Sequence, residues 1–301
     1  MINVLRRWRP AILALCAAAL LPLAAWSVEV PPIADPPTGE YQRGKLVWID
    51  LVTTNLPGAR RFYAGLFGWT FADLGQGNGK GRGAYTLAYQ DGAPVAGLTQ
   101  RKPRVGQARQ ARWIAFMSVA DVEAAAKDVA AMGGRVLVPP RNVPARGEMA
   151  LVADPDGAPF GLINSSSGDP PEGLPPAGDW IWALYQSPDA TSAAAFYQDV
   201  GGYEVVPDDR LGEAPHFLLV AGGYARASVV GIPAERAGLP PDWLYFARVR
   251  NINESLRRVR ELGGSVLMQP NPEVLDGRLA VITDPAGAPL GLMEWEAADG
   301  Q

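Results

Sequence analysis

Residues 113–138, WIAFMSVADVEAAAKDVAAMGGRVLV, return as residues 243–268, WLYFARVRNINESLRRVRELGGSVLM. A similar closing stretch follows each copy, ADPDGAPFGLI at 153–163 and TDPAGAPLGLM at 283–293. Upstream, WIDLVTTNLPGARRFYAGLFGW (48–69) is echoed by WALYQSPDATSAAAFYQDVGGY (182–203). An internal repeat of this kind indicates two copies of one structural unit, each about 120 residues long. The second copy is slightly shorter, and the glycine-rich stretch GQGNGKGRG (75–83) is the predicted loop where a deletion is tolerated.

The composition is that of a globular protein with a substantial core, because 48% of the residues are hydrophobic and 19% are charged. The net charge of -4 and the lack of a Lys/Arg stripe argue against a nucleic-acid partner. We place the two domains at residues 44–165 and 179–297. A proline-rich tether (28–43) precedes the first, and a linker of similar composition (166–178) separates them. We expect both connecting segments to be extended and without a core of their own.

Residues 1–27 have the pattern of an export signal. Three arginines precede an apolar run, and Ala25-Trp26-Ser27 fits a small-residue cleavage site. The sequence leaves two outcomes open: cleavage and release to the periplasm or the outside of the cell, or retention as an inner-membrane anchor. Cys16, the single cysteine, lies in this segment, so the rest of the chain offers no thiol for a disulfide, a nucleophile or a metal.

Each repeat is predicted to contain two modules of the form β-α-β-β-β. Alternating apolar residues predict a strand over 45–53, and Asn55 can cap the helix that follows. A second helix is expected from about Val122 to Met132, ended by Gly133-Gly134. Asp154-Pro-Asp-Gly157 predicts a hairpin turn between the last two strands. The loops 139–147 and 269–277 are expected to form rims.

The paired modules, the helix ending in FY, the GG helix stop and the closing DPDGxxxGL hairpin resemble the vicinal oxygen chelate superfamily of glyoxalases, bleomycin-resistance proteins and extradiol dioxygenases. The resemblance covers both repeats. It implies an α+β fold of two tandem domains, in which paired βαβββ modules form a curved mixed sheet around a cup. It also implies, for many members, a divalent metal held by His, Glu or Gln on inward strand faces.

The positions that match those ligands carry other residues here. They are Trp48 and Trp182 on the first strands, Ile114 and Leu244 on the next, and Gly161 and Gly291 on the closing strands. A fourth position falls within 95–99 and 225–230, which contain neither His nor Glu, and the whole chain has one histidine, His216. We therefore expect cups without a metal or other cofactor.

Several residues are candidates for contact with a ligand. Aromatic side chains are expected to line the cups, and three polar residues share the inward strand phase. Arg248 could clamp an anion and Asp50 could act as a general base, although the simpler explanations are a structural ion pair for Arg248 and a solvated or arginine-paired carboxylate for Asp50. His216 and Glu294 are more simply explained as structural. The predicted ligand-binding residues are Trp48, Asp50, Phe116, Trp182, Gln186, Phe246, Arg248 and Trp295.

The leading functional hypothesis is an exported, metal-free module that binds or sequesters a small organic molecule in an aromatic-lined cup. One alternative is a metal-dependent enzyme of glyoxalase, lyase or dioxygenase type. Another is a scaffold whose cups are plugged and whose outer faces bind a partner. The sequence leaves the ligand, the open cup and the oligomeric state undetermined.

Overall fold

The computed structural model describes residues 30–74, 85–103, 111–208, 214–233 and 238–296. These residues form two mixed sheets of eight strands each. The first repeat contains β1 (Leu46–Thr53), α1 (Leu56–Phe67), β2 (Thr70–Leu74), β3 (Tyr85–Gln90), β4 (Ala93–Gln100), β5 (Arg112–Ser118), α2 (Val122–Ala131), β6 (Arg135–Val143), β7 (Gly147–Ala153) and β8 (Pro159–Ser165). The second contains β9 (Trp180–Ser187), α3 (Ala190–Gly201), β10 (Glu204–Pro207), β11 (His216–Ala221), β12 (Tyr224–Gly231), β13 (Asp242–Val249), α4 (Ile252–Glu261), β14 (Ser265–Met268), the short helix η4 (Leu275–Gly277), β15 (Leu279–Thr283) and β16 (Pro289–Glu294).

Both sheets have the same strand order. It is β2-β3-β4-β1-β5-β8-β7-β6 in the first and β10-β11-β12-β9-β13-β16-β15-β14 in the second. Within each module the first strand runs parallel to the last, and the two modules of a sheet join through an antiparallel pair, β1 with β5 or β9 with β13. The predicted α+β fold of tandem domains built from paired βαβββ modules is confirmed.

The local signals act as predicted. The side chain of Asn55 accepts a hydrogen bond from the Gly58 N–H at 3.0 Å and caps α1. Gly133 follows α2 with φ of 90°, a conformation that glycine adopts without strain. The Gly157 N–H donates to the Asp154 carbonyl at 3.0 Å, which closes the predicted hairpin turn.

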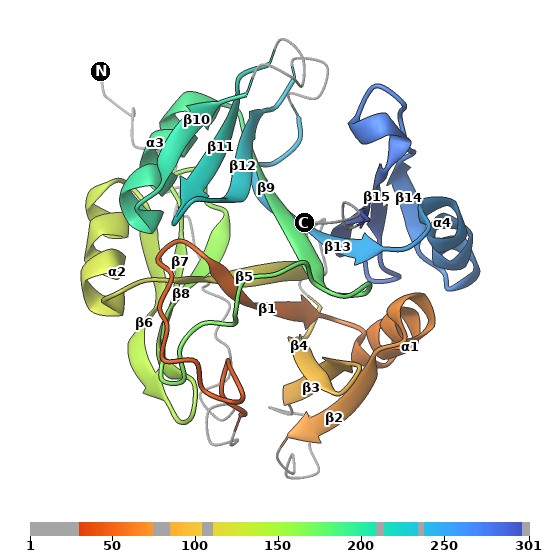
Figure 1. Ribbon diagram of the computed structural model, residues 1–301, viewed down its shortest axis with the longest axis horizontal. Helices are drawn as coiled ribbons and strands as arrows, with labels where there is room; N and C mark the ends of the chain where they lie inside the picture. The colour runs from red at the N-terminus through yellow and green to blue at the C-terminus, as the bar shows by residue number, and fades with distance from the viewer. Residues whose placement is uncertain (1–29, 75–84, 104–110, 209–213, 234–237, 297–301) are drawn as a thin grey trace, which may run out of the picture.

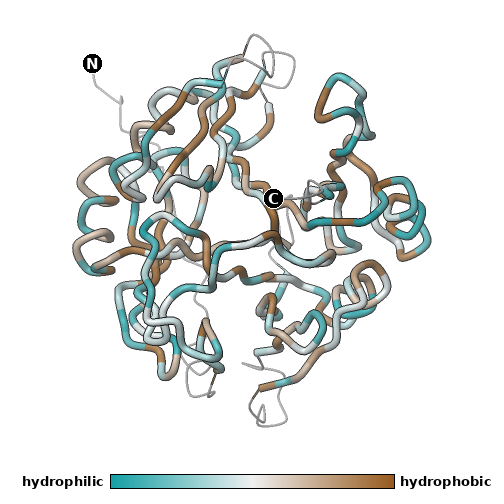
Figure 2. The backbone as a smooth tube through the Cα atoms, viewed as in Figure 1, coloured by the Kyte–Doolittle hydropathy of each residue, from teal (hydrophilic) through white to brown (hydrophobic). Residues whose placement is uncertain are grey.

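The core is shared by the two repeats. Figure 1 shows α2 beside α3 on one side of the molecule and α1 beside α4 on the other, so each helix packs near a helix of the opposite repeat. One continuous cluster of buried apolar side chains runs through both repeats. Figure 2 shows α4 as largely hydrophilic, and its buried residues Ile252, Leu256 and Val259 form one apolar stripe.

Two hydrogen-bonded chains tie the repeats together. The Trp243 indole N–H donates to the Tyr197 hydroxyl at 2.8 Å, and that hydroxyl donates to Asp154 Oδ2 of the other repeat at 2.7 Å. Burial raises the pKa of Asp154 and of Tyr197, so the pair is most stable as a neutral tyrosine donating to the carboxyl group. The equivalent chain, with bonds of 3.2 and 3.4 Å, consists of Trp113, Tyr63 and Asp284.

The described residues of both connecting segments form no helix or strand and pack against the two domains. Ile33 and Ala34 of the tether are buried, as are Ser167 and Asp169 of the linker. The predicted loop 139–147 is also shorter than expected, because β6 continues to Val143 through two register shifts. Strand pairing with β7 extends there because the irregular register accommodates Pro139 and Pro140.

Some predictions fall outside the described residues. The export signal at 1–27 and the glycine-rich loop at 75–83 are among them. Within the described ranges, no helix has the length and apolar character needed to cross a membrane.

Candidate functional site

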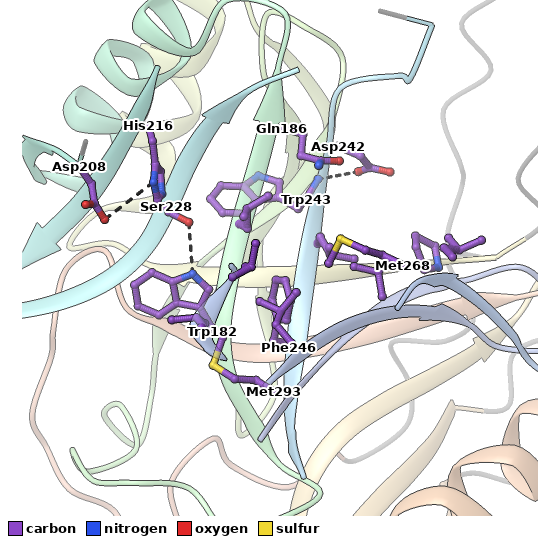
Figure 3. Close-up of a pocket in the computed structure, with 18 of the residues that line it drawn as sticks. Trp182, Gln186, Asp208, His216, Ser228, Asp242, Trp243, Phe246, Met268 and Met293 are labelled. Atoms are coloured by element: carbon purple, nitrogen blue, oxygen red, sulfur yellow. Dashed lines mark hydrogen bonds and ion pairs between the residues drawn. The ribbon is translucent and has the colours of Figure 1, made fainter. Parts of the chain in front are cut away.

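A cavity of about 1140 Å³ lies against the second sheet (Figure 3). Its walls come from both modules of the second repeat, together with the segment that connects β14 to β15. Most of the lining side chains are apolar, with a few polar groups among them. The residues that form the floor and the polar wall are Trp182, Leu184, Gln186, Asp208, His216, Ser228, Asp242, Leu244, Phe246 and Met293.

The floor consists of cross-strand pairs from β9 and β13. Trp182 lies opposite Phe246, and Gln186 lies opposite Asp242, with a leucine pair between them. Alternation along a strand sends every second side chain to the same face, so these three pairs present one surface to the cavity. The floor therefore changes from aromatic at one end to polar at the other.

The position of the Phe246 ring depends on the glycine beside it. Phe246 pairs with Gly291 of β16, and a Cβ added to Gly291 would lie 2.1 Å from the Phe246 ring carbon Cδ1. Phe116 and Gly161 make the same arrangement in the first repeat, with a distance of 2.0 Å. In each repeat the phenylalanine ring occupies the space beside the closing-strand glycine. A carboxylate side chain at that position would therefore overlap the ring.

The residues at the family's ligand positions do not fit a divalent metal. Indole, aliphatic carbon and glycine occupy them, and none of these supplies a donor atom that such an ion prefers. Among the described residues, no three His, Cys, Asp or Glu side chains are placed to hold an ion together.

A polar wall stands beside Trp182. The Trp182 indole N–H donates to Ser228 Oγ at 3.2 Å, and His216 Nδ1 lies 3.8 Å from Asp208 Oδ2. Both side chains of the His216–Asp208 pair are buried, and Figure 3 shows them close to Ser228 at the edge of the cavity. A lone histidine at the start of a strand does not predict this contact of His216 with Asp208 or its place at the cavity.

Exposed apolar side chains surround the opening. Leu239, Leu267 and Trp295 line the cavity and retain 42%, 61% and 40% of their exposure. Glu273, Val274 and Leu275 of the predicted rim at 269–277 also line it. Apolar surface gathered at a cavity mouth is typical of a site that covers a ligand.

Four of the predicted ligand residues, Trp182, Gln186, Phe246 and Trp295, line this cavity, whereas Arg248 does not. Arg248 lies at the end of β13, where its guanidinium donates to the carbonyls of Trp295 and Pro175, both at 2.7 Å. Strand alternation predicts that Arg248 points inward, but its hydrogen bonds to these two carbonyls hold the guanidinium away from the cavity. Glu294 accepts a hydrogen bond from the Ile252 N–H at 2.7 Å and so stabilises the start of α4.

The other three predicted residues, Trp48, Asp50 and Phe116, lie together against the first sheet. Asp50 Oδ1 accepts hydrogen bonds from the Trp48 indole at 2.8 Å and from the Tyr85 hydroxyl at 2.6 Å. Burial raises the pKa of Asp50, although these bonds and the charge of Arg146 oppose the shift. Tyr85 and Arg146 lie in no recognisable motif, so their place in this cup cannot be predicted from the sequence.

The two cups carry different polar groups at matching positions. Asp50 pairs with Gly97 across β1 and β4, whereas Leu184 pairs with Ser228 at the matching place in the second sheet. His216 begins β11 where Tyr85 begins β3. The first cup therefore has a polar residue, Asp50, at its centre. The second cup has Leu184 at the matching place, and its polar groups lie at the wall.

Comparison with known proteins agrees with this architecture. Residues 45–162 match the model of the Glyoxalase/Bleomycin resistance protein/Dioxygenase superfamily, and residues 182–293 match that of the Glyoxalase-like domain. The chain belongs to this superfamily, in its tandem two-domain form.

Relatives and structures resemble the chain over most of its length. A Mycobacterium tuberculosis protein named "Putative glyoxylase CFP32" is 29% identical over 261 residues, covering 86% of this chain and 98% of that protein. The anthracycline biosynthesis protein DauV of a Streptomyces species is 29% identical over 283 residues, with the same coverage. The Mn(II)-bound glyoxalase from Novosphingobium aromaticivorans has a TM-score of 0.57 at 16% identity, covering 84% of this chain and 83% of that one. The 2,2',3-trihydroxybiphenyl 1,2-dioxygenase from Sphingomonas wittichii has a TM-score of 0.54 at 17% identity, covering 84% and 91%.

Proposed function

We propose that this chain is a metal-free binding protein that holds one small organic molecule in the cavity of its second repeat. The observation that carries the proposal is the cross-strand pair Trp182 and Phe246, which forms an aromatic floor in the cavity, with Trp182 at a position where the family resemblance implies a metal ligand. A flat molecule can stack on such a floor, and its apolar edges can contact the exposed side chains at the opening.

The cavity also supports a ligand with polar groups at one end. Gln186 and Asp242 lie at the polar end of the floor, and the His216–Asp208 pair stands at the wall. The cavity volume of about 1140 Å³ slightly exceeds the range for sites of drug-sized ligands, about 300–1000 Å³, so the cavity has room for a large ligand. The names of the Streptomyces relatives refer to anthracyclines, and a planar aromatic body with polar substituents matches this distribution.

Catalysis is the second candidate. A buried imidazole 3.8 Å from a carboxylate at a cavity wall is a combination that can move protons. The name of the mycobacterial relative points in the same direction. A scaffold role is favoured only for the first repeat, whose cup is covered by the chain's own residues 30–34.

Export is part of the proposal and rests on the sequence of residues 1–27. On this view the protein captures its ligand in the periplasm or outside the cell. Amino-terminal sequencing of the secreted protein tests it, since cleavage after Ser27 gives a chain that begins at Val28. An intact amino terminus in the membrane fraction would instead support the anchored form.

Ligand binding is tested by titrating the purified protein with a fluorescent anthracycline. We expect saturable 1:1 binding, weakened roughly five- to 150-fold by Trp182→Ala, because stacking on one aromatic ring contributes about 1–3 kcal/mol. Trp48→Ala, at the matching position of the first repeat, is the control and should leave the affinity unchanged. Equal loss in both variants would refute the assignment to the second cup.

The metal-free part of the proposal needs its own measurement. Elemental analysis of the purified protein should find less than stoichiometric divalent metal. Neither Mn²⁺ nor Zn²⁺ should raise the unfolding temperature, because a bound ion stabilises the folded state by mass action. A stoichiometric ion, or metal-dependent turnover of a glyoxalase or catechol substrate, would support the enzyme instead.

A further inference from the structure

The first cup contains a piece of the chain itself. Ile33 retains 7% of its exposure and packs in one apolar cluster with Trp48 and Phe116 of the sheet, with Val30 packed at its border. This segment forms no strand and pairs with neither sheet. It is therefore held by side-chain contacts and individual hydrogen bonds, as a bound peptide is.

A buried arginine holds the segment in place. The Arg146 side chain donates from Nε to the Pro31 carbonyl at 2.7 Å, and its guanidinium carbon lies 3.7 Å from the centre of the Trp48 ring. Arg146 retains only 2% of its exposure, so the segment and the cup together enclose its charge. A cation over an indole ring and a charged hydrogen bond to a carbonyl are both strong contacts when water is excluded.

A second contact fixes the end of the segment. The Ala34 N–H donates to Ser167 Oγ at 3.0 Å, and the Thr38 N–H donates to the Ser167 carbonyl at 2.9 Å. The linker between the repeats thus forms one wall of the place that the segment occupies. Asp35, Pro36 and Pro37 remain exposed beyond it.

The cup retains a binding group that the segment does not use. Arg146 Nη2 is buried and has no hydrogen-bond partner among the described residues. Leaving a charged donor unpaired in the interior is unfavourable. The segment therefore uses only part of the hydrogen-bonding capacity of the Arg146 guanidinium.

We propose that the first cup is a peptide-binding site, occupied in cis by residues Val30–Ala34 of the chain's own amino-terminal segment. Its ligand class is an extended, proline-containing apolar peptide with a backbone carbonyl directed at Arg146. Proline restricts such a peptide to extended conformations before binding, which lowers the entropy lost on association. The cis occupant keeps the first cup closed while the cavity of the second repeat stays open.

The test uses the whole chain and a synthetic peptide of residues 28–37, VEVPPIADPP. The unsubstituted chain should not bind the peptide, because a tethered segment competes at an effective concentration in the millimolar range. Ile33→Asn puts a buried amide among apolar side chains and should release the segment, so this variant should bind the peptide 1:1 in calorimetry. Pro37→Asn changes an exposed residue of the same segment and should behave as the unsubstituted chain.

Two further substitutions define the contacts. A peptide that carries Asn in place of Ile33 should bind the Ile33→Asn chain at least tenfold more weakly than the natural peptide. Adding Arg146→Gln to the Ile33→Asn chain should weaken its affinity for the natural peptide by at least tenfold. Equal peptide binding by the unsubstituted and Ile33→Asn chains would overturn the proposal, as would no binding by either. Dimers of the unsubstituted chain that exchange the segment between copies would overturn occupancy in cis.

Hydrogen exchange covers the case in which Ile33→Asn does not fold. In the unsubstituted chain the Ala34 amide should exchange at least a hundredfold more slowly than in the free peptide, since it is buried and donates to Ser167. Exchange at the rate of the free peptide would show that the segment does not occupy the cup.

Discussion

Gly291→Ala tests whether the floor of the second cup is built around a missing side chain. Gly291 lies in regular strand β16 without a positive φ, so alanine is compatible with its backbone. The added Cβ would nevertheless lie 2.1 Å from Phe246 Cδ1, well inside the ordinary contact limit of 3.4 Å. The Phe246 ring, which is 1% exposed, must then shift by about 1 Å toward the cavity.

The expected loss of stability is about 1–3 kcal/mol, the usual effect of inserting a methyl group into a packed interior. Phe246→Ala alone should cost about 3–5 kcal/mol. The double variant should lose less than the sum of the two, because the clash disappears with the ring. Anthracycline binding should weaken in Gly291→Ala, since the displaced ring enters the cavity.

Urea unfolding of the four proteins in the cycle gives the coupling energy, provided that the slopes of the transitions agree. Gly238→Ala is the control, because no atom of the described residues lies within 4 Å of the Cβ it would add, and it should change stability by less than about 0.5 kcal/mol. Additive losses in the double variant would refute the steric reasoning. So would a Gly291→Ala protein as stable as the unsubstituted chain.

Three further predictions concern the interface between the repeats, the start of the second domain and the opening of the cavity. Tyr197→Phe should lower the free energy of unfolding in urea by about 1–3 kcal/mol, because it leaves two buried groups without their hydrogen bonds. The loss should be larger than for Tyr63→Phe, because the bond from Tyr63 to the opposite aspartate is 3.4 Å long. Equal losses would contradict this prediction. Burial raises the pKa of Asp179 to about 6, so the stability that its neutral form contributes should be lost as the pH rises from about 4 through 6. Asp179→Asn should flatten this pH dependence of the melting temperature. An unchanged pH profile in the variant would contradict the prediction. Trp295→Ala should leave the melting temperature within a few degrees and weaken anthracycline binding about three- to tenfold, whereas an unaltered affinity would exclude this ring from the site.

The sequence was sufficient for the fold because its decisive signals are local. Asn55 caps a helix through the Gly58 N–H three residues later, and Asp154 and Gly157 close a turn within four residues. The repetition of these signals in order then gave the architecture. Strand alternation also placed Trp182, Gln186 and Phe246 on one face.

The remaining features depend on contacts between distant residues. The composition of VPPIADPP indicates an extended chain, but its burial depends on Arg146, 115 residues from the Pro31 carbonyl that it holds. Arg248 has the inward phase of its strand, yet carbonyls from two other segments determine where its guanidinium lies. Strand alternation predicts on which face of the sheet a side chain begins. It does not predict which groups the end of a long side chain contacts.

The crossed bonds of the hairpin aspartates also constrain how the molecule can be assembled. Tyr63 can form its hydrogen bond only after Asp284 has been synthesised. Asp154 likewise can accept its hydrogen bond only after Tyr197 has been synthesised. Neither half can therefore complete its interior alone during translation. A gene divided at the junction would yield two fragments, each dependent on the other to cover its aromatic surface.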